Sequence, residues 1–194
     1  MANLHFFTGC MNSGKSTKLL QDRYSFIQKN QKVWVIKPFI DRTAEPKVIS
    51  RIGLEAPAEI MKEIKWQDII QRKEFYSDVI MIDEVQFFKP KDINSLVKLA
   101  DTYNRLVFCY GLTTDVNEKL FPAAAQLIAC GAKIHYMASS CEMIGCKNLA
   151  NHHLRYDPRG FVIRDGKSVD VDDGHVIYKS VCRQCYDREM QKKR

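Results

Sequence analysis

The chain has 194 residues, of which 45% are hydrophobic and 27% are charged, and its formal net charge is +7. This length and apolar content fit one folded domain, or one domain with a small appendage, and exclude a globally disordered chain. No apolar run approaches the roughly 20 residues that cross a bilayer, and the first residues lack the pattern of a secretion signal. We therefore expect a cytoplasmic protein with no membrane partner.

The first part of the chain alternates short apolar strands with helices. Strands are expected over residues 3–8, 32–37, 78–83, 105–111 and 133–138, and helices over 16–29, 90–104 and 121–132. Continuous apolar strands alternating with helices predict an α/β fold, with a parallel sheet covered by helices on both faces. Residues 38–58 are expected to be irregular, because they contain charged residues and two prolines.

The composition changes after residue 139, where cysteines, histidines, glycines and charges replace the apolar runs. We place a boundary there, with an α/β domain over 1–139 and a small subdomain with a basic tail over 140–194. The positive charge fits either nucleic-acid binding or a solvated basic surface. No long block of lysine and arginine is present, so we favour the second interpretation.

The segment "GCMNSGKST", residues 9–17, has the spacing G-x-x-x-x-G-K-[ST] of a phosphate-binding loop. In such a loop, backbone N–H groups point at the phosphates, and the following helix presents its positive end. Lys15 would neutralise the β- and γ-phosphates of ATP, and the Ser16 hydroxyl would bind Mg²⁺. The loop follows an expected strand and precedes an expected helix, which is the context that this interpretation requires.

The segment "VIMIDEVQFF", residues 79–88, places two acidic residues at the end of an apolar strand. Asp83 fits the carboxylate that organises Mg²⁺ in phosphate-loop enzymes, and Glu84 could accept a proton from the attacking group. That group is water in an ATPase and a hydroxyl in a kinase, so the two acids alone leave both reactions open. Of the two aromatic residues that follow, we expect Phe87 to lie at the pocket.

Two close cysteine pairs, Cys141 with Cys146 and Cys182 with Cys185, are separated by 35 residues. Two such pairs folding onto each other make a tetrahedral thiolate site of the zinc-ribbon type. Four cysteine ligands would leave no open position, so this zinc would be structural. It would close the turn-rich segment between the pairs at its base, and such a segment could act as a lid over a small acceptor.

The ordered set of motifs resembles the type II thymidine kinase family over residues 4–187. The motifs are "GCMNSGKST", "KPFID", "IDEVQFF", "YGLTTD", "LFPAAAQLIACGAKI", a cysteine pair and "YKSVCRQCY". The resemblance implies a RecA-like phosphate-loop domain with a zinc-bound lasso that closes over the nucleoside. It also implies transfer of the γ-phosphate of ATP to the 5′-hydroxyl of thymidine, a homotetramer, and feedback binding of dTTP.

The resemblance assigns a role to each matching residue. Glu84 is the general base. The ATP phosphates and Mg²⁺ are bound by Gly9, Met11, Asn12, Ser13, Gly14, Lys15, Ser16, Thr17, Asp41, Arg42 and Asp83. The nucleoside site is lined by Met11, Gln86, Phe87, Leu112, Val116, His153, Val171, Gly174 and Tyr178. Structural zinc is held by Cys141, Cys146, Cys182 and Cys185.

Three positions depart from the family pattern near the base of the nucleoside. Val85 replaces a glycine, Val116 replaces an aromatic residue, and His153 stands where the family has a threonine near the thymine ring. The sequence therefore leaves thymidine, deoxyuridine and 5-modified deoxyuridine open as substrates. The alternative function is a zinc-ribbon phosphate-loop ATPase acting on nucleic acid, which would release free phosphate instead of a nucleoside monophosphate.

Overall fold

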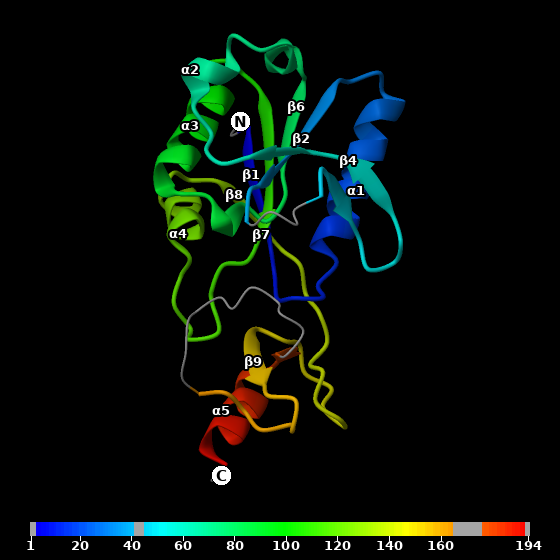
Figure 1. Ribbon diagram of the computed structural model, residues 1–194, viewed down its shortest axis with the longest axis vertical. Helices are drawn as coiled ribbons and strands as arrows, with labels where there is room; N and C mark the ends of the chain where they lie inside the picture. The colour runs from blue at the N-terminus through cyan, green and yellow to red at the C-terminus, as the bar shows by residue number, and fades with distance from the viewer. Residues whose placement is uncertain (1–2, 41–44, 165–175, 193–194) are drawn as a thin grey trace.

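A computed structural model describes residues 3–40, 45–164 and 176–192 (Figure 1). Its centre is a six-stranded sheet in the order β5-β2-β6-β7-β1-β8. Every pairing in this sheet is parallel, which confirms the expected α/β fold. The strands are β1 (Leu4–Thr8), β2 (Val33–Pro38), β5 (Glu59–Met61), β6 (Val79–Ile82), β7 (Leu106–Gly111) and β8 (Lys133–Tyr136).

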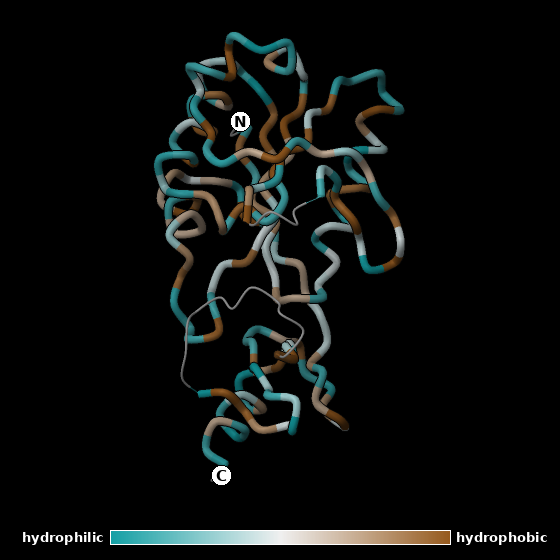
Figure 2. The backbone as a smooth tube through the Cα atoms, viewed as in Figure 1, coloured by the Kyte–Doolittle hydropathy of each residue, from teal (hydrophilic) through white to brown (hydrophobic). Residues whose placement is uncertain are grey.

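Helices cover both faces of the sheet. Helix α1 (Lys15–Gln28) lies on one side, and α3 (Pro90–Asp101) and α4 (Pro122–Ala129) lie on the other (Figure 1). Strand β6 is fully buried, because alternate side chains of a strand point to opposite faces and each face has its own apolar cluster. Hydrophobic stretches accordingly mark the central strands in Figure 2. The short elements α2 (Trp66–Ile69), η1 (Lys73–Tyr76) and η2 (Val85–Phe87) complete this part of the chain.

Two expectations about the strands of this part of the chain are wrong. Residues 38–58 are not all irregular, because β3 (Lys47–Ile49) and β4 (Glu55–Pro57) form an antiparallel hairpin. The hairpin is held by the burial of Val48 and Ala56 in the cluster on the α1 side, a long-range contact that its charged, proline-containing sequence does not reveal. Strand β8 is an edge strand instead of a core strand, because β1 is its only partner among the described strands.

A small second layer of structure lies beyond the carboxyl ends of the parallel strands (Figure 1). It consists of the antiparallel pair β9 (His152–Tyr156) and β10 (Ile177–Val181), followed by α5 (Arg183–Gln191). These elements pack around an apolar cluster of their own, which contains three of the four paired cysteines. The domain boundary at residue 139 stays a prediction. In the described part of the chain, no helix has both the length and the apolar character needed to span a membrane.

Candidate active site

The loop between β1 and α1 contains two positions that favour glycine. A Cβ atom on Gly9 would lie 2.2 Å from the carbonyl oxygen of Met137, so only glycine fits there. Gly14, directly before α1, has a φ of 80°, a left-handed conformation that glycine adopts without strain. Asn12 is also left-handed, with a φ of 64°. The two glycines of the motif are therefore favoured for different reasons, the lack of space at Gly9 and the backbone conformation at Gly14.

Lys15 is buried at the first position of α1 and turns back over this loop. Its Nζ donates hydrogen bonds to the carbonyl oxygens of Gly9, at 3.1 Å, and Cys10, at 2.8 Å. Burial lowers the pKa of Lys15, and the nearby charge of Glu84 opposes that shift. Ser16 and Thr17 follow in the first turn of α1 and are half-buried. Lys15 Nζ therefore lies at the loop, where it could bind an anionic ligand.

Asp83 and Glu84 directly follow β6, at the carboxyl ends of the parallel strands, where the phosphate loop also begins after β1. Asp83 is buried, and its burial, with the neighbouring charge of Glu84, raises the pKa of Asp83 to about 7; Lys37 opposes the shift. Glu84 has a φ of 50°, a left-handed conformation that is uncommon for residues other than glycine. Such conformations persist where the surrounding structure enforces them, often at functional sites.

Gln86 is the residue that holds Glu84 in place. Its Nε2 donates to Glu84 Oε2 at 2.5 Å, and its Oε1 accepts the backbone N–H of Leu112 at 3.0 Å. The side chain of Gln86 is buried, and it lies so close to Gly111 that a Cβ atom there would be 2.4 Å from Oε1. Phe87 is half-buried and meets Phe121 edge-on. The sequence assigned Gln86 to the nucleoside site through the resemblance alone, and it gave no sign of this contact.

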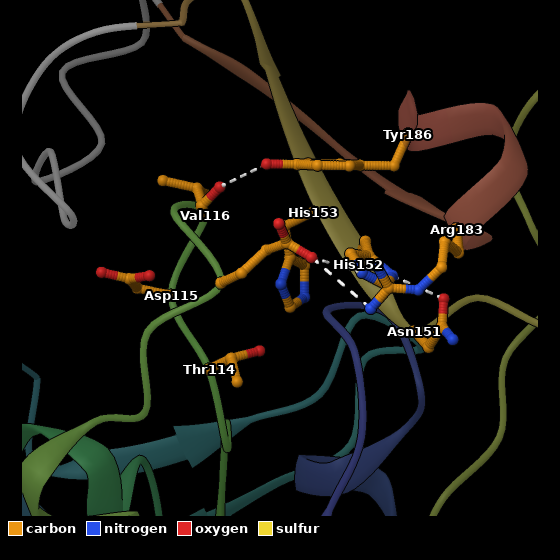
Figure 3. A pocket seen from close by; sticks show the side chains of 9 residues that line it. Thr114, Asp115, Val116, Asn151, His152, His153, Arg183 and Tyr186 are labelled. Carbon is orange, nitrogen blue, oxygen red and sulfur yellow. Dashed lines mark hydrogen bonds and ion pairs between the residues drawn. The ribbon is translucent and has the colours of Figure 1, made fainter. Parts of the chain in front are cut away.

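A cavity of about 280 Å³ lies between the loop after β7 and the β9 hairpin (Figure 3). Two of the expected nucleoside residues, Val116 and His153, line it together. His153 lies on β9 and is only 5% exposed, so it is not an exposed loop histidine. The complete lining is Thr114, Asp115, Val116, Glu118, Asn151, His152, His153, Arg183 and Tyr186.

Sequence reasoning missed the polar network on the far wall of this cavity. His152 Nε2 lies 2.9 Å from Glu118 Oε1, and Arg183 Nη2 lies 3.6 Å from the same oxygen. The hydroxyl of Tyr186 donates to the carbonyl of Val116 at 3.4 Å. These contacts join the loop after β7 to the second layer. No local sequence pattern could have found them, since the partners are 34 to 70 residues apart.

The four paired cysteines converge on one point, with their Sγ atoms all within 4.8 Å of one another. Cys146 Sγ and Cys182 Sγ are 3.7 Å apart, close to the roughly 3.8 Å expected between two sulfurs of a tetrahedral site with Zn–S bonds of about 2.3 Å. The N–H of Cys182 donates to Cys141 Sγ at 3.3 Å. The donor set therefore fits a structural zinc ion.

Comparison with known proteins identifies the family of the chain. A family model described as thymidine kinase matches residues 2–186. The chain belongs to the thymidine kinase family. Thymidine kinases of Shewanella oneidensis and Photorhabdus laumondii are 33% and 35% identical to it over 190 residues, covering 95% and 96% of this chain and 96% and 92% of theirs. The thymidine kinase of Rhizobium meliloti is 34% identical over 197 residues, covering 98% of this chain and 99% of its own.

Some site residues expected from the thymidine kinase family have no described geometry. Asp41, Arg42, Val171 and Gly174 lie outside the described residues. Tyr178 is half-buried on β10, opposite Arg155 in the register. Met11, Leu112 and Val116 are half-buried, Asn12 is exposed, and Ser13 is half-buried with an Oγ that has no hydrogen-bond partner among the described residues.

Proposed function

We propose that this protein transfers the γ-phosphate of ATP to the 5′-hydroxyl of thymidine, or of deoxyuridine or a 5-modified deoxyuridine. Membership of the thymidine kinase family carries the proposal. The position of Lys15 and the acidic pair at one edge of the sheet supports it. Ligands of open parallel sheets bind at the carboxyl ends of the strands.

The donor site would be the loop of residues 9–17. The Lys15 ammonium, now donating to two loop carbonyls, would turn to the β- and γ-phosphates of ATP. Ser16 and Asp83 would hold Mg²⁺, which supplies charge neutralisation to the transferring phosphoryl group. Burial disfavours the ionised form of Asp83 and raises its pKa, and an adjacent cation would restore that form. Asp41 and Arg42 are proposed on the same side from the family pattern.

The base would be Glu84. Its carboxylate accepts the hydrogen bond from Gln86 Nε2, and its backbone is left-handed, with a φ of 50°. A carboxylate held in this way can accept the proton of the 5′-hydroxyl as that oxygen attacks phosphorus. A fixed orientation matters, because positioning supplies a large part of the rate enhancement in phosphoryl transfer.

The nucleoside would bind between the phosphate loop, the segment after β7 and the β9–β10 hairpin. The proposed lining is Met11, Gln86, Phe87, Leu112, Val116, His153 and Tyr178, together with Val171 and Gly174. Structural zinc on Cys141, Cys146, Cys182 and Cys185 would hold the hairpin in place. The proposal extends, from the resemblance alone, to a cytoplasmic homotetramer that binds dTTP as a feedback ligand. Sedimentation with and without dTTP tests the oligomeric state and its response to dTTP.

Product analysis tests the proposed function. The enzyme is given ATP labelled at the γ-phosphate with thymidine, with deoxyuridine, with a 5-modified deoxyuridine, or with a polynucleotide. We expect labelled nucleoside 5′-monophosphate and no stimulation by the polynucleotide. Release of free labelled phosphate, stimulated by the polynucleotide, would instead indicate the alternative function, an ATPase that acts on nucleic acid. A zinc site and a net charge of +7 are also compatible with that function.

A further inference from the structure

The antiparallel pair β9–β10 contacts the phosphate loop at Met11. Its contact residue His153 is 142 positions away from Met11 in the sequence. The backbone N–H of Met11 donates to His153 Nε2 at 2.9 Å. The carbonyl oxygen of Met11 accepts a hydrogen bond from Ser180 Oγ at 2.7 Å. The two contacts come from adjacent strands, since Ser180 and His153 are register partners. They fix two consecutive peptide groups of the loop.

The peptide group between Cys10 and Met11 is held at both ends. Its carbonyl oxygen accepts from Lys15 Nζ at 2.8 Å and from the N–H of Ser13 at 3.2 Å. Its N–H donates to His153 Nε2. When Lys15 turns to bound phosphate, the Cys10 carbonyl oxygen loses one of its two hydrogen-bond donors, and His153 still accepts the N–H of the same peptide group.

We propose that His153 is a positioning residue for ATP binding: its Nε2, with the hydroxyl of Ser180, locks the Met11 segment of the phosphate loop in its binding conformation. The inference rests on the proposed function, because it takes residues 9–17 as the ATP site. The hairpin thereby joins the donor site to the acceptor side. His153 lines the cavity of Figure 3 with the same ring that anchors the loop.

The chemistry of the ring suits this role. Nε2 accepts a hydrogen bond, so the neutral ring carries its proton on Nδ1. Burial is the main reason that the pKa of His153 is lowered to about 4; Lys15 and His152 add to the shift and Glu142 opposes it. At neutral pH the ring is therefore uncharged and remains an acceptor.

Glu142, next to zinc-site Cys141, makes a third link to the same loop. Its Oε1 accepts from Asn12 Nδ2 at 2.5 Å, and its Oε2 accepts the N–H of Ser180 at 2.9 Å. Asn12 is the loop residue with a left-handed backbone. The carboxylate thus braces both the loop and the strand that contacts it, although it is exposed to solvent.

Three variants and a control test the positioning role. His153→Leu removes the acceptor at similar size, His153→Gln can return an acceptor at the same reach, and Ser180→Ala removes the second anchor. Lys179→Gln is the control, since Lys179 lies on β10 next to Ser180 and covers the ring of Tyr156 instead of the loop. Calorimetry with a non-hydrolysable ATP analogue measures donor affinity directly, and zinc content and melting temperature report on the fold.

We expect the Leu variant to bind the analogue about tenfold more weakly, since the N–H of the half-buried Met11 loses its hydrogen-bond partner, and Ser180→Ala to bind it severalfold more weakly. The Gln variant should return to within about threefold of the parent protein, and the control should equal it. Unchanged analogue affinity in both the Leu and Ala variants would overturn the proposal. So would equal weakening in the Leu and Gln variants, or an effect on the KM for thymidine alone.

Two further arms keep the outcomes separate. If His153→Leu does not fold, Ser180→Ala alone decides, because it leaves a smaller change in the hairpin. Lys15→Ala tests the proposed ATP site itself and should abolish analogue binding. Loss of binding in Lys15→Ala with no change in the His153 and Ser180 variants rejects only the positioning role, whereas retained binding in Lys15→Ala rejects the ATP site.

Discussion

Replacing Gln86 should impair phosphoryl transfer, because Gln86 donates the hydrogen bond that orients the proposed base Glu84. Gln86→Met keeps the length and volume of the side chain but removes its donor to Glu84 and its acceptor for the Leu112 N–H. A hydrogen bond to a charged group contributes about 1.5–3 kcal/mol, and an unpaired buried donor costs about 1–3 kcal/mol. Because Leu112 is only half-buried, we expect a loss of about 2–4 kcal/mol in the free energy of unfolding.

The kinetic effect follows from the freedom that Glu84 gains. A base that is misplaced by about 1 Å can lose on the order of 100-fold in rate, so kcat should fall by about 10- to 100-fold. The assay is steady-state turnover at saturating ATP and thymidine, paired with urea unfolding under reducing conditions.

The matched variant Gln86→Glu separates the two contacts. It retains an acceptor for the Leu112 N–H but offers Glu84 a second carboxylate in place of a donor. We expect Gln86→Glu to retain more stability than Gln86→Met while losing at least as much kcat. If Gln86→Met turns over within twofold of the parent enzyme, Gln86 is only a structural residue and the positioning of Glu84 has been misread.

Three further predictions concern the loop, the hairpin and the cysteines. Gly9→Ala should unfold the loop or expel Met137, because the added Cβ would lie 2.2 Å from a backbone oxygen; a melting temperature and ATP affinity equal to the parent values would contradict this. The pKa of His153 is lowered from its ordinary value of 6.5 to about 4 in the folded protein. Between pH 4 and pH 6.5 the unfolded state therefore binds more protons than the folded state. The free energy of unfolding is thus lost as the pH falls through this range, by about 3 kcal/mol in total. The difference in unfolding free energy between the parent protein and His153→Gln should shrink by that amount from pH 7 to pH 4, and a constant difference would refute the assignment. Metal analysis of the purified protein should find close to one zinc per chain and much less in Cys182→Ser; absence of zinc from the parent protein would reject the four-cysteine site.

The parts of the fold that local sequence predicts are those with a strong local cause. The phosphate loop was predictable because Gly9, Gly14 and Lys15 stand at a spacing that few other structures need. Strand β6 and the acids after it were predictable because a fully buried strand is a continuous apolar run. The cysteine pairs predicted a tetrahedral site, and their sulfurs do converge.

The rest depends on contacts between distant segments. The β3–β4 hairpin was missed because only its packing near α1 makes strands of such short, charged segments. The exposure of β8 was missed because an edge position depends on strand order, which the sequence of a single strand does not reveal. The contacts of Gln86 with Leu112, and of His153 with Met11, join residues 26 and 142 positions apart. No periodicity carries such information.

The most direct test of the account is single-turnover transfer of a labelled γ-phosphate from ATP to thymidine by the parent enzyme and by Glu84→Gln. The substitution keeps the size of the side chain and removes the proton acceptor. We predict labelled thymidine 5′-monophosphate from the parent enzyme, a loss of at least about 100-fold in the rate of transfer by the variant, and nearly equal affinity of the two proteins for ATP. A general base contributes at least about 100-fold to the rate. Transfer by the variant at more than a few per cent of the parent rate, on the order of the residual expected without a base, would therefore contradict the assignment of Glu84 as the base.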